Sequence, residues 1–134
     1  MRTIALDFET TGLSVHKDNV FNIGAFDGTL ELDLFINSYG GEQIKLEQEI
    51  HDLTGINTEI LNSTECRAES RRIQFTKLLD YIRGDGSPVT IVWHNGKSFD
   101  SYFLVRALND EGLTFPENIN VFIDTYLWAR YDLK

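Results

Sequence analysis

The stretch Ile4-Ala5-Leu6-Asp7-Phe8-Glu9-Thr10-Thr11-Gly12-Leu13 decides the fold, because an apolar run ends in two carboxylates one residue apart and then in a turn. Side chains two residues apart in a β-strand point to the same face, so Asp7 and Glu9 should project together from the end of a buried strand. Two such acids repel each other unless a cation or a shared proton lies between them, so we expect a raised pKa without metal. Hard oxygen ligands of this kind suit Mg²⁺ or Mn²⁺. A bare Asp-x-Glu pair is more often a solvated strand end, so the residues around it must decide.

The composition indicates one globular domain over residues 1–134, with 42% hydrophobic residues and nine Phe, five Tyr and two Trp. No apolar run reaches the roughly 20 residues of a membrane span, and the N-terminal sequence lacks a signal-peptide pattern. The single cysteine, Cys66, cannot form an internal disulfide. We therefore expect a cytoplasmic protein with no membrane partner.

The net charge of −9 argues against a protein that binds a phosphate backbone by bulk attraction. It is compatible with a protein whose acids hold metal ions, which then supply the positive charge.

The hydrophobic pattern predicts an α/β domain with a mixed sheet. Strands are expected at residues 3–8, 20–26, 30–36, 89–93 and 121–123, and helices at 44–53, 57–61, 65–82, 99–108 and from Thr125 onward. Asp27-Gly28 predicts a two-residue hairpin turn between the second and third strands. The almost continuous apolar run of the first strand predicts that both of its faces are covered.

A second acidic segment, Val92-Trp93-His94-Asn95-Gly96-Lys97-Ser98-Phe99-Asp100, places Asp100 just after a strand and in the first turn of a helix. Taken alone, an Asp there is explained by the helix dipole and by the free N–H groups of the first turn. Catalytic acids in α/β sheets gather beyond strand ends, so Asp7, Glu9 and Asp100 together describe one site.

The sequence resembles the DEDD-type (DEDDh-like) 3′→5′ exonucleases of the ribonuclease H-like fold, a family that includes the proofreading epsilon subunit of bacterial DNA polymerase III and ribonuclease T. The resemblance rests on ordered motifs along almost the whole chain: Leu6 to Leu13, Asn22-Ile23-Gly24-Ala25, His51-Asp52-Leu53-Thr54-Gly55-Ile56, His94-Asn95 with Phe99-Asp100, Ile123-Asp124-Thr125, and Leu127-Trp128-Ala129-Arg130. It implies a mixed five-stranded sheet flanked by helices.

The resemblance also implies the roles of individual residues. Two metal ions, Mg²⁺ or Mn²⁺, would lie roughly 4 Å apart. Asp7 would bridge both ions, Glu9 would bind one and place the attacking water, and Asp100 would support the second. The 3′ end of single-stranded DNA or RNA would be held by residues of the two motifs, namely Thr10, Thr11, Gly12, Leu13, His94, Asn95 and Phe99. For His94 and Asn95 a purely structural role in the turn is an equal alternative.

The third motif of the family, a helix with a general-base His and a last metal-binding Asp, has no match before Lys134, since the histidines His16, His51 and His94 all lie upstream. Relative to the family the domain is expected to be C-terminally incomplete, with its C-terminal helix region truncated. Loss of the base alone typically costs about 10²–10⁴ in rate, so weak or absent activity is expected. A C-terminal extension or a protein partner would supply the motif; the alternative is a pseudo-exonuclease that binds nucleic-acid ends or proteins.

Overall fold

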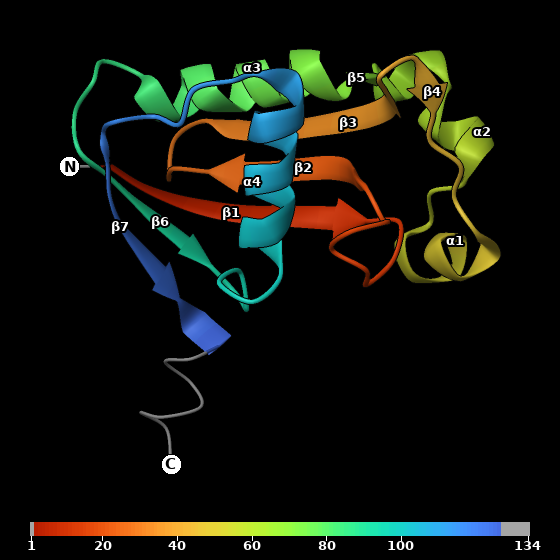
Figure 1. Cartoon of the computed structure of the whole chain (residues 1–134), viewed down its shortest axis with the longest axis horizontal. Coiled ribbons are helices and arrows are strands. Elements are labelled where there is room, and N and C mark those ends of the chain that lie inside the picture. Colours follow the sequence, from red (N-terminus) through yellow and green to blue (C-terminus); the bar gives the residue numbers. More distant parts are fainter. Residues whose placement is uncertain (1, 127–134) are drawn as a thin grey trace.

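The chain folds around one mixed β-sheet in a computed structural model that describes residues 2–126 (Figure 1). Within these residues the sheet has seven strands in the order β4-β3-β2-β1-β6-β7, with β5 paired to β3. β1 pairs antiparallel with β2 and parallel with β6, and β7 continues the parallel half. The strands are β1 (Arg2–Thr10), β2 (Val20–Phe26), β3 (Glu31–Tyr39), β4 (Glu42–Gln43), β5 (Glu69–Ser70), β6 (Val89–Trp93) and β7 (Ile119–Asp124). The five longer strands are those that the sequence predicts, and the ribonuclease H-like α/β fold is confirmed.

The helices follow the capping signals of the sequence. Asn57 accepts a hydrogen bond from the backbone of Ile60, and Gly55 ends the preceding helix in a left-handed conformation. The α-helices in residues 2–126 are α1 (Gln48–Thr54), α2 (Thr58–Leu61), α3 (Arg71–Arg83) and α4 (Asp100–Glu111). None of them has the length and apolar composition that a bilayer crossing needs.

Two helices begin later than predicted. The predicted helix 44–53 starts only at Gln48, because Ile44 is buried in an extended segment whose backbone N–H donates to Asn37. The predicted helix 65–82 starts only at Arg71, because Arg67 takes a left-handed conformation with φ of 51°. The helix predicted from Thr125 onward extends into residues 127–134, which lie outside the described part of the chain.

The core lies between one face of the sheet and helices α3 and α4. Ile4, Leu6 and Phe8 alternate along β1 as buried side chains, and the ring of Phe8 meets that of Phe75 on α3 edge-on at 5.7 Å. An apolar stripe on α3, spaced i, i+3, i+4 and i+7, is buried in this core, as are four apolar residues of α4: Phe75, Leu78, Leu79 and Ile82, with Phe103, Leu104, Ala107 and Leu108.

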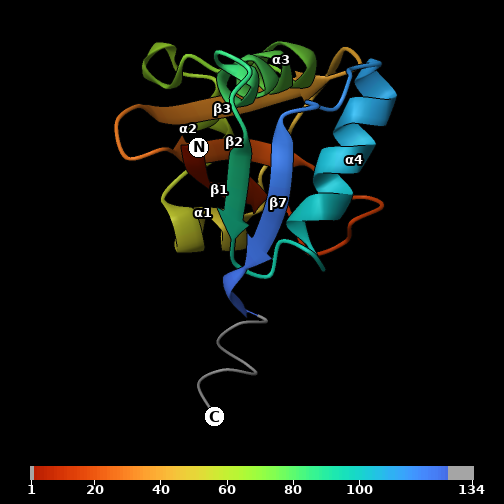
Figure 2. The same ribbon diagram turned by 90° about the vertical axis from the view of Figure 1, so that its left-hand side faces the viewer.

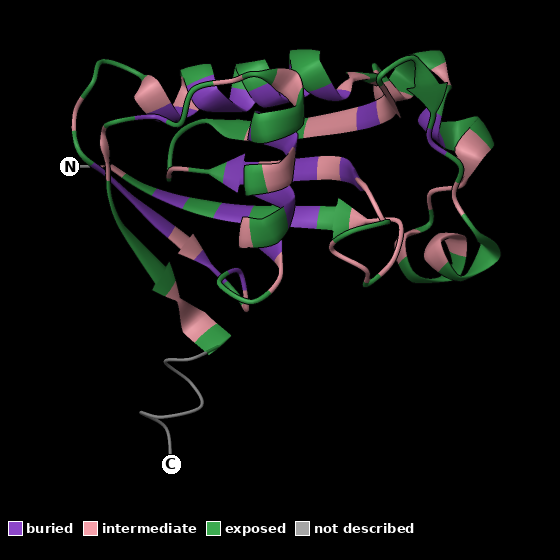
Figure 3. Ribbon diagram, in the orientation of Figure 1, coloured by how far each residue is buried: buried purple, intermediate pink, exposed green. Residues whose placement is uncertain are grey.

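The opposite face of the sheet is open. Thr3, Ala5, Asp7 and Glu9 of β1 point to this face and are exposed, so that buried and exposed residues alternate along the strand (Figure 3). Helix α4 lies to one side of β6 and β7 in the turned view (Figure 2). Within residues 2–126 the prediction that both faces of the first strand are covered is therefore wrong. This is unusual, because β1, β6 and β7 run parallel and parallel sheets are normally covered on both faces.

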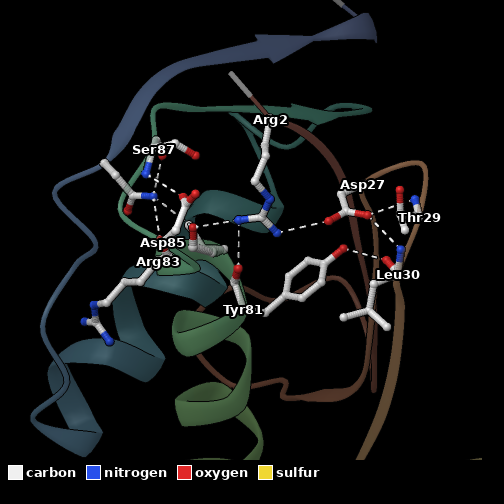
Figure 4. A network of polar contacts seen from close by, with 10 residues as sticks. Arg2, Asp27, Thr29, Leu30, Tyr81, Arg83, Asp85 and Ser87 are labelled. Atoms are coloured by element: carbon white, nitrogen blue, oxygen red, sulfur yellow. Dashed lines mark hydrogen bonds and ion pairs between the residues drawn. The ribbon is translucent and has the colours of Figure 1, made fainter.

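A polar network joins the start of β1 to the β2–β3 connection and to α3 (Figure 4). Arg2 donates to the carbonyl oxygen of Tyr81 at 3.0 Å and pairs with Asp27 at 3.1 Å, while Tyr81 donates to the carbonyl oxygen of Leu30. Hydrogen bonds from the backbone N–H groups of Leu30 and Thr29, and then from Arg2, lower the pKa of Asp27 to about 2. The connection comprises residues 27–30, so the predicted two-residue turn is wrong.

The core predicts a large difference between two substitutions on the same helix. Phe75→Ala removes a fully buried ring and should lower the free energy of unfolding by about 3–5 kcal/mol. Ile73→Ala, at an exposed position two residues earlier, should cost less than about 1 kcal/mol. Urea unfolding followed by circular dichroism measures both. Equal losses would contradict the assignment of the α3 stripe to the core.

Candidate active site

The two acids of β1 lie on the open face of the sheet. Asp7 and Glu9 are both exposed there, as their spacing predicts. Gly24 of β2 lies directly opposite Asp7 in the register, so no side chain from that position crowds this carboxylate. A register shift between Glu9 and Thr10 then ends the regular pairing with β2.

Asp100 reaches the same region from the other side of the sheet. It is the first residue of α4 and is only 4% exposed. The parallel pairing of β1 with β6 ends at Ala5 and Val92, so the backbone of Phe8 has no β6 residue opposite it. The backbone N–H of Phe8 lies close enough to the carboxylates of Asp7 and Asp100 to lower the pKa of each. One backbone amide therefore links the first and second acidic motifs.

The pKa values of all three acids are raised, as the sequence predicts, but loss of solvent contact is a larger cause than repulsion between them. Burial raises the pKa of Asp100 to about 7, and the charges of Asp7, Glu9 and Asp124 add to the effect. Burial also raises the pKa of Asp7, although its hydrogen bond from Phe8 lowers it. The pKa of Glu9 is raised first by burial and then by the charge of Asp7. Asp100 is buried, whereas Asp7 and Glu9 are exposed on the sheet face and only partly desolvated by their neighbours.

The donor chemistry of this cluster suits a hard divalent cation, because carboxylates that raise one another's pKa gain from positive charge between them. As the side chains stand, however, no three His, Cys, Asp or Glu residues in the range 2–126 are grouped so that they could hold one ion. A metal would require these side chains to turn toward it, or a ligand from outside this range.

Asp124 holds the loop that leads into α4. Its carboxylate accepts hydrogen bonds from the backbone N–H groups of Asn95 at 2.7 Å and Lys97 at 3.1 Å. Asn95 has a φ of 58°, and a Cβ atom at Gly96 would lie 2.0 Å from the Trp93 ring, so only glycine fits there. Asp124 belongs to a segment that resembles the family, but the sequence assigned it no role. The structure shows that it fixes the backbone of the loop before α4.

The remaining predicted residues of this loop differ in their surroundings. His94 is exposed, and its Nδ1 lies 3.0 Å from the Thr125 hydroxyl. Phe99 is half-buried and packs against Phe103, with ring centroids 4.9 Å apart. The turn role considered for Asn95 agrees with its backbone geometry, whereas the side chain of His94 is accessible to a ligand.

The residues after Glu9 form a tight turn on the same side of the site. The Thr10 hydroxyl donates to the carbonyl oxygen of Gly12 at 2.8 Å, and the Thr11 hydroxyl donates to Asp18 at 3.0 Å. Leu13 projects from this turn and is 87% exposed. The first motif therefore exposes the apolar side chain of Leu13 to solvent, on a turn that is held by hydrogen bonds between its own residues and to Asp18.

A hollow of about 370 Å³ beside Glu9 contains residues that the sequence did not identify individually. Its walls include Asn22 of β2 and Leu53 and Thr54 of α1, and Leu53 is 83% exposed. Asn22 and Leu53 belong to two of the segments that resemble the family. The resemblance could have identified Asn22 and Leu53 as candidate site residues. Their position beside Glu9 becomes evident only from the fold.

Comparison with known proteins gives a family match over most of the chain. The RNase_T exonuclease model matches residues 4–134. Exonuclease DPD1, chloroplastic/mitochondrial, from Arabidopsis thaliana is 28% identical over 140 residues, which cover all of this chain and 42% of DPD1. A PolC-type DNA polymerase III from Clostridium perfringens is 31% identical over 137 residues, covering 98% of this chain and 8% of the polymerase. The chain therefore spans less than half the length of these relatives.

Solved structures share the fold. A product-bound exonuclease I superimposes with a TM-score of 0.75 at 15% identity, covering 99% of this chain and 32% of the other. Exonuclease I from Methylocaldum szegediense gives a TM-score of 0.77 at 16% identity, covering 96% of this chain and 28% of the other. At this identity the likeness establishes the sheet and helix arrangement alone.

The raised pKa of Asp100 predicts how the metal-free protein responds to pH. A group whose pKa is near 7 when folded and about 3.8 when unfolded stabilises the fold fully below pH 4 and loses this effect as the pH rises through 7. Asp100→Asn should therefore flatten the fall in melting temperature between pH 5 and pH 8, and at pH 8 it should stabilise by about 1–2 kcal/mol.

Scanning calorimetry in the presence of a chelator measures this effect. Glu59→Gln, at an exposed position on α2, is the matched control and should leave the pH profile unchanged. An Asp100→Asn profile that coincides with that of the unmodified protein would show that Asp100 is ionised in the fold at neutral pH.

Proposed function

Since the chain belongs to the RNase_T exonuclease family, we propose that residues 1–134 form one domain of a metal-dependent 3′→5′ exonuclease that acts on single-stranded DNA or RNA. The observation that carries the proposal is the convergence of Asp7 and Asp100 on the N–H of Phe8, with Glu9 on the same face as Asp7. A cytoplasmic location, expected from the sequence, is part of the same proposal.

Asp7, Glu9 and Asp100 are the proposed metal ligands and catalytic acids. A bound Mg²⁺ or Mn²⁺ would make the attacking water more acidic and would stabilise the leaving 3′ oxygen. Asp7 and Glu9 reach this region from the open face, where water and substrate have access, whereas Asp100 is buried beside the backbone of Phe8. Glu9 is the acid best placed to orient a water, because the hollow of about 370 Å³ lies beside it.

The terminal nucleotide is proposed to lie between the two loops of the site. Backbone groups of Thr10, Thr11 and Gly12 hold it, and Leu13 contacts its base with an otherwise solvated side chain. On the other side, His94, Asn95 and Phe99 shape the pocket, with His94 available for polar contact.

The open sheet face is the proposed binding surface for the segment that carries the missing His and Asp. It bears Val121 and Ile123 of β7, which are 43% and 42% exposed. The strand β7 belongs to the parallel half of the sheet, and parallel sheets are normally covered by helices on both faces. Its β1 strand also carries Asp7, so a helix on this face would bring its side chains to the acids. Such a helix would belong either to a C-terminal extension or to a protein partner.

Metal binding is tested by thermal unfolding with and without Mn²⁺. A cation that binds only the folded state raises its stability, by about 1 kcal/mol when present at several times its Kd. Asp7→Asn should abolish this increase and raise the metal-free melting temperature, because it removes a repelling charge. Glu31→Gln, an exposed acid on β3, should respond to Mn²⁺ like the unmodified protein. An unchanged Mn²⁺ response in Asp7→Asn would remove Asp7 from the ligand set.

The activity test compares residues 1–134 with a form that also carries a helix with His and Asp. The 134-residue form should degrade a single-stranded oligonucleotide weakly or not at all, because loss of a general base costs about 10²–10⁴ in rate. The longer form should release mononucleotides with Mn²⁺, and Asp7→Ala in that form should abolish the release.

Two other outcomes would change the assignment. Rapid, Asp7-dependent digestion by residues 1–134 alone would show that the missing motif is not required. Tight binding of 3′ ends without cleavage by either form would favour the pseudo-exonuclease.

A further inference from the structure

The loop of residues 11–19 is held by several hydrogen bonds between its own residues. The Asp18 carboxylate accepts hydrogen bonds from the Thr11 hydroxyl at 3.0 Å and from the Ser14 backbone N–H at 2.9 Å. The two ends of the loop are joined because the Thr11 N–H donates to the Asn19 carbonyl oxygen and the Thr11 hydroxyl oxygen accepts a hydrogen bond from the Asn19 N–H. A Cβ atom at Gly12 would lie 2.5 Å from the Asp18 carboxylate, so the turn is closed around this acid.

A side chain from α4 fastens this loop to the body of the protein. The guanidinium of Arg106 donates to the carbonyl oxygen of Val15 at 2.6 Å, to the carbonyl oxygen of Asp18, and to Oδ1 of Asn19 at 3.0 Å. These partners lie 87 to 91 residues away in the sequence. Val15 also packs against the core, so the loop has both a polar and an apolar anchor.

The same helix begins with Asp100, six positions before Arg106. α4 therefore connects rigidly to the acidic cluster at its first residue and to the loop through Arg106. At the tip of that loop, Leu13 is 87% exposed, although the residues around it are fixed by hydrogen bonds. Ordering a loop has an entropic cost, and an exposed leucine does not offset it within the folded chain.

We infer that Arg106 is a positioning residue, which fixes the 11–19 loop to α4 so that Leu13 is held at a set place relative to Asp7 and Asp100 to contact the terminal base of a 3′ end. The inference rests on the proposed function and adds a residue to it. Three of the five guanidinium N–H donors of Arg106 bind the loop on either side of its tip, so its effect on substrate binding is assigned to the loop and, through the loop, to Leu13.

A double-substitution cycle between Arg106 and Leu13 tests this coupling. The readout is the Kd for a 5′-labelled single-stranded oligonucleotide with a free 3′ hydroxyl, measured by fluorescence anisotropy with Ca²⁺ to prevent turnover. Arg106→Gln and Leu13→Ala should each weaken binding about fivefold, which is the loss of roughly one well-made contact. The two together should bind no more weakly than either alone, because Arg106 acts only through Leu13.

Two further variants separate geometry from charge and from stability. Arg106→Lys keeps the positive charge but cannot reach three acceptors with one ammonium group, so it should weaken binding like Arg106→Gln. Arg83→Gln is the matched control, since Arg83 of α3 also donates to a loop carbonyl, that of Thr114, and should leave binding unchanged. Asn19→Ala removes a single acceptor and serves as a milder change if Arg106→Gln does not fold.

Hydrogen exchange reports on the loop independently of binding. The amides of Ser14, Asp18 and Asn19 should exchange at least about tenfold faster in Arg106→Gln, while those of β1 stay unchanged. Faster exchange with unaltered Kd, full affinity in Arg106→Lys, or additive losses with Leu13→Ala would each overturn the inference. If the unmodified chain binds no oligonucleotide with any divalent ion, the proposed function itself fails, and the inference fails with it.

Discussion

The separation of β1 from β6 after Ala5 and Val92 is the constraint on which the candidate site depends. Beyond that point the N–H of Phe8 would be buried without a partner, which costs about 1–3 kcal/mol. The carboxylate of Asp100, the first residue of α4, lies beside this N–H. In this position the Asp100 carboxylate loses contact with solvent and lies near the charge of Asp7. Both effects disfavour its ionised form. The raised pKa of Asp100 is the consequence, and a cation is the natural means of relieving it.

The asymmetry of the sheet explains why acids and apolar residues share one surface. Buried residues of β1 face α3 and α4, while Ala5, Asp7 and Glu9 face the open side. Val121 and Ile123 of β7 extend this side with apolar surface that has no cover within residues 2–126. A layer on that face would bury the apolar strands and enclose the acids at the same time, so completion of the core and completion of the site would be one event.

Sequence reasoning succeeded where the signal was local. Residues 20–26 and 89–93 were predicted as strands with the observed bounds, because the hydrophobic pattern of a strand depends on neighbours in the chain. The start of α3 was missed although Ser70 is a capping residue whose side chain accepts a hydrogen bond from the N–H of Ile73, because helical propensity continues through Arg67, whose φ of 51° interrupts the helix. The pairing of Asp7 and Glu9 on one face was local too, whereas the burial of Asp100 depends on strand separation.

What the sequence could not provide was the long-range support of the site. Asp124 holds the loop before Asp100 through backbone N–H groups 27 and 29 residues away, and Arg106 holds the loop after Glu9 across about 90 residues. Neither contact leaves a periodic pattern. Both follow one principle, since each loop is fixed by a side chain whose own position is set by regular structure, β7 for Asp124 and α4 for Arg106. If these two loops were mobile, the acids would stay in place but the loop residues would not be held at fixed positions around a substrate. The contacts that fix both loops therefore support a role of this surface in ligand binding.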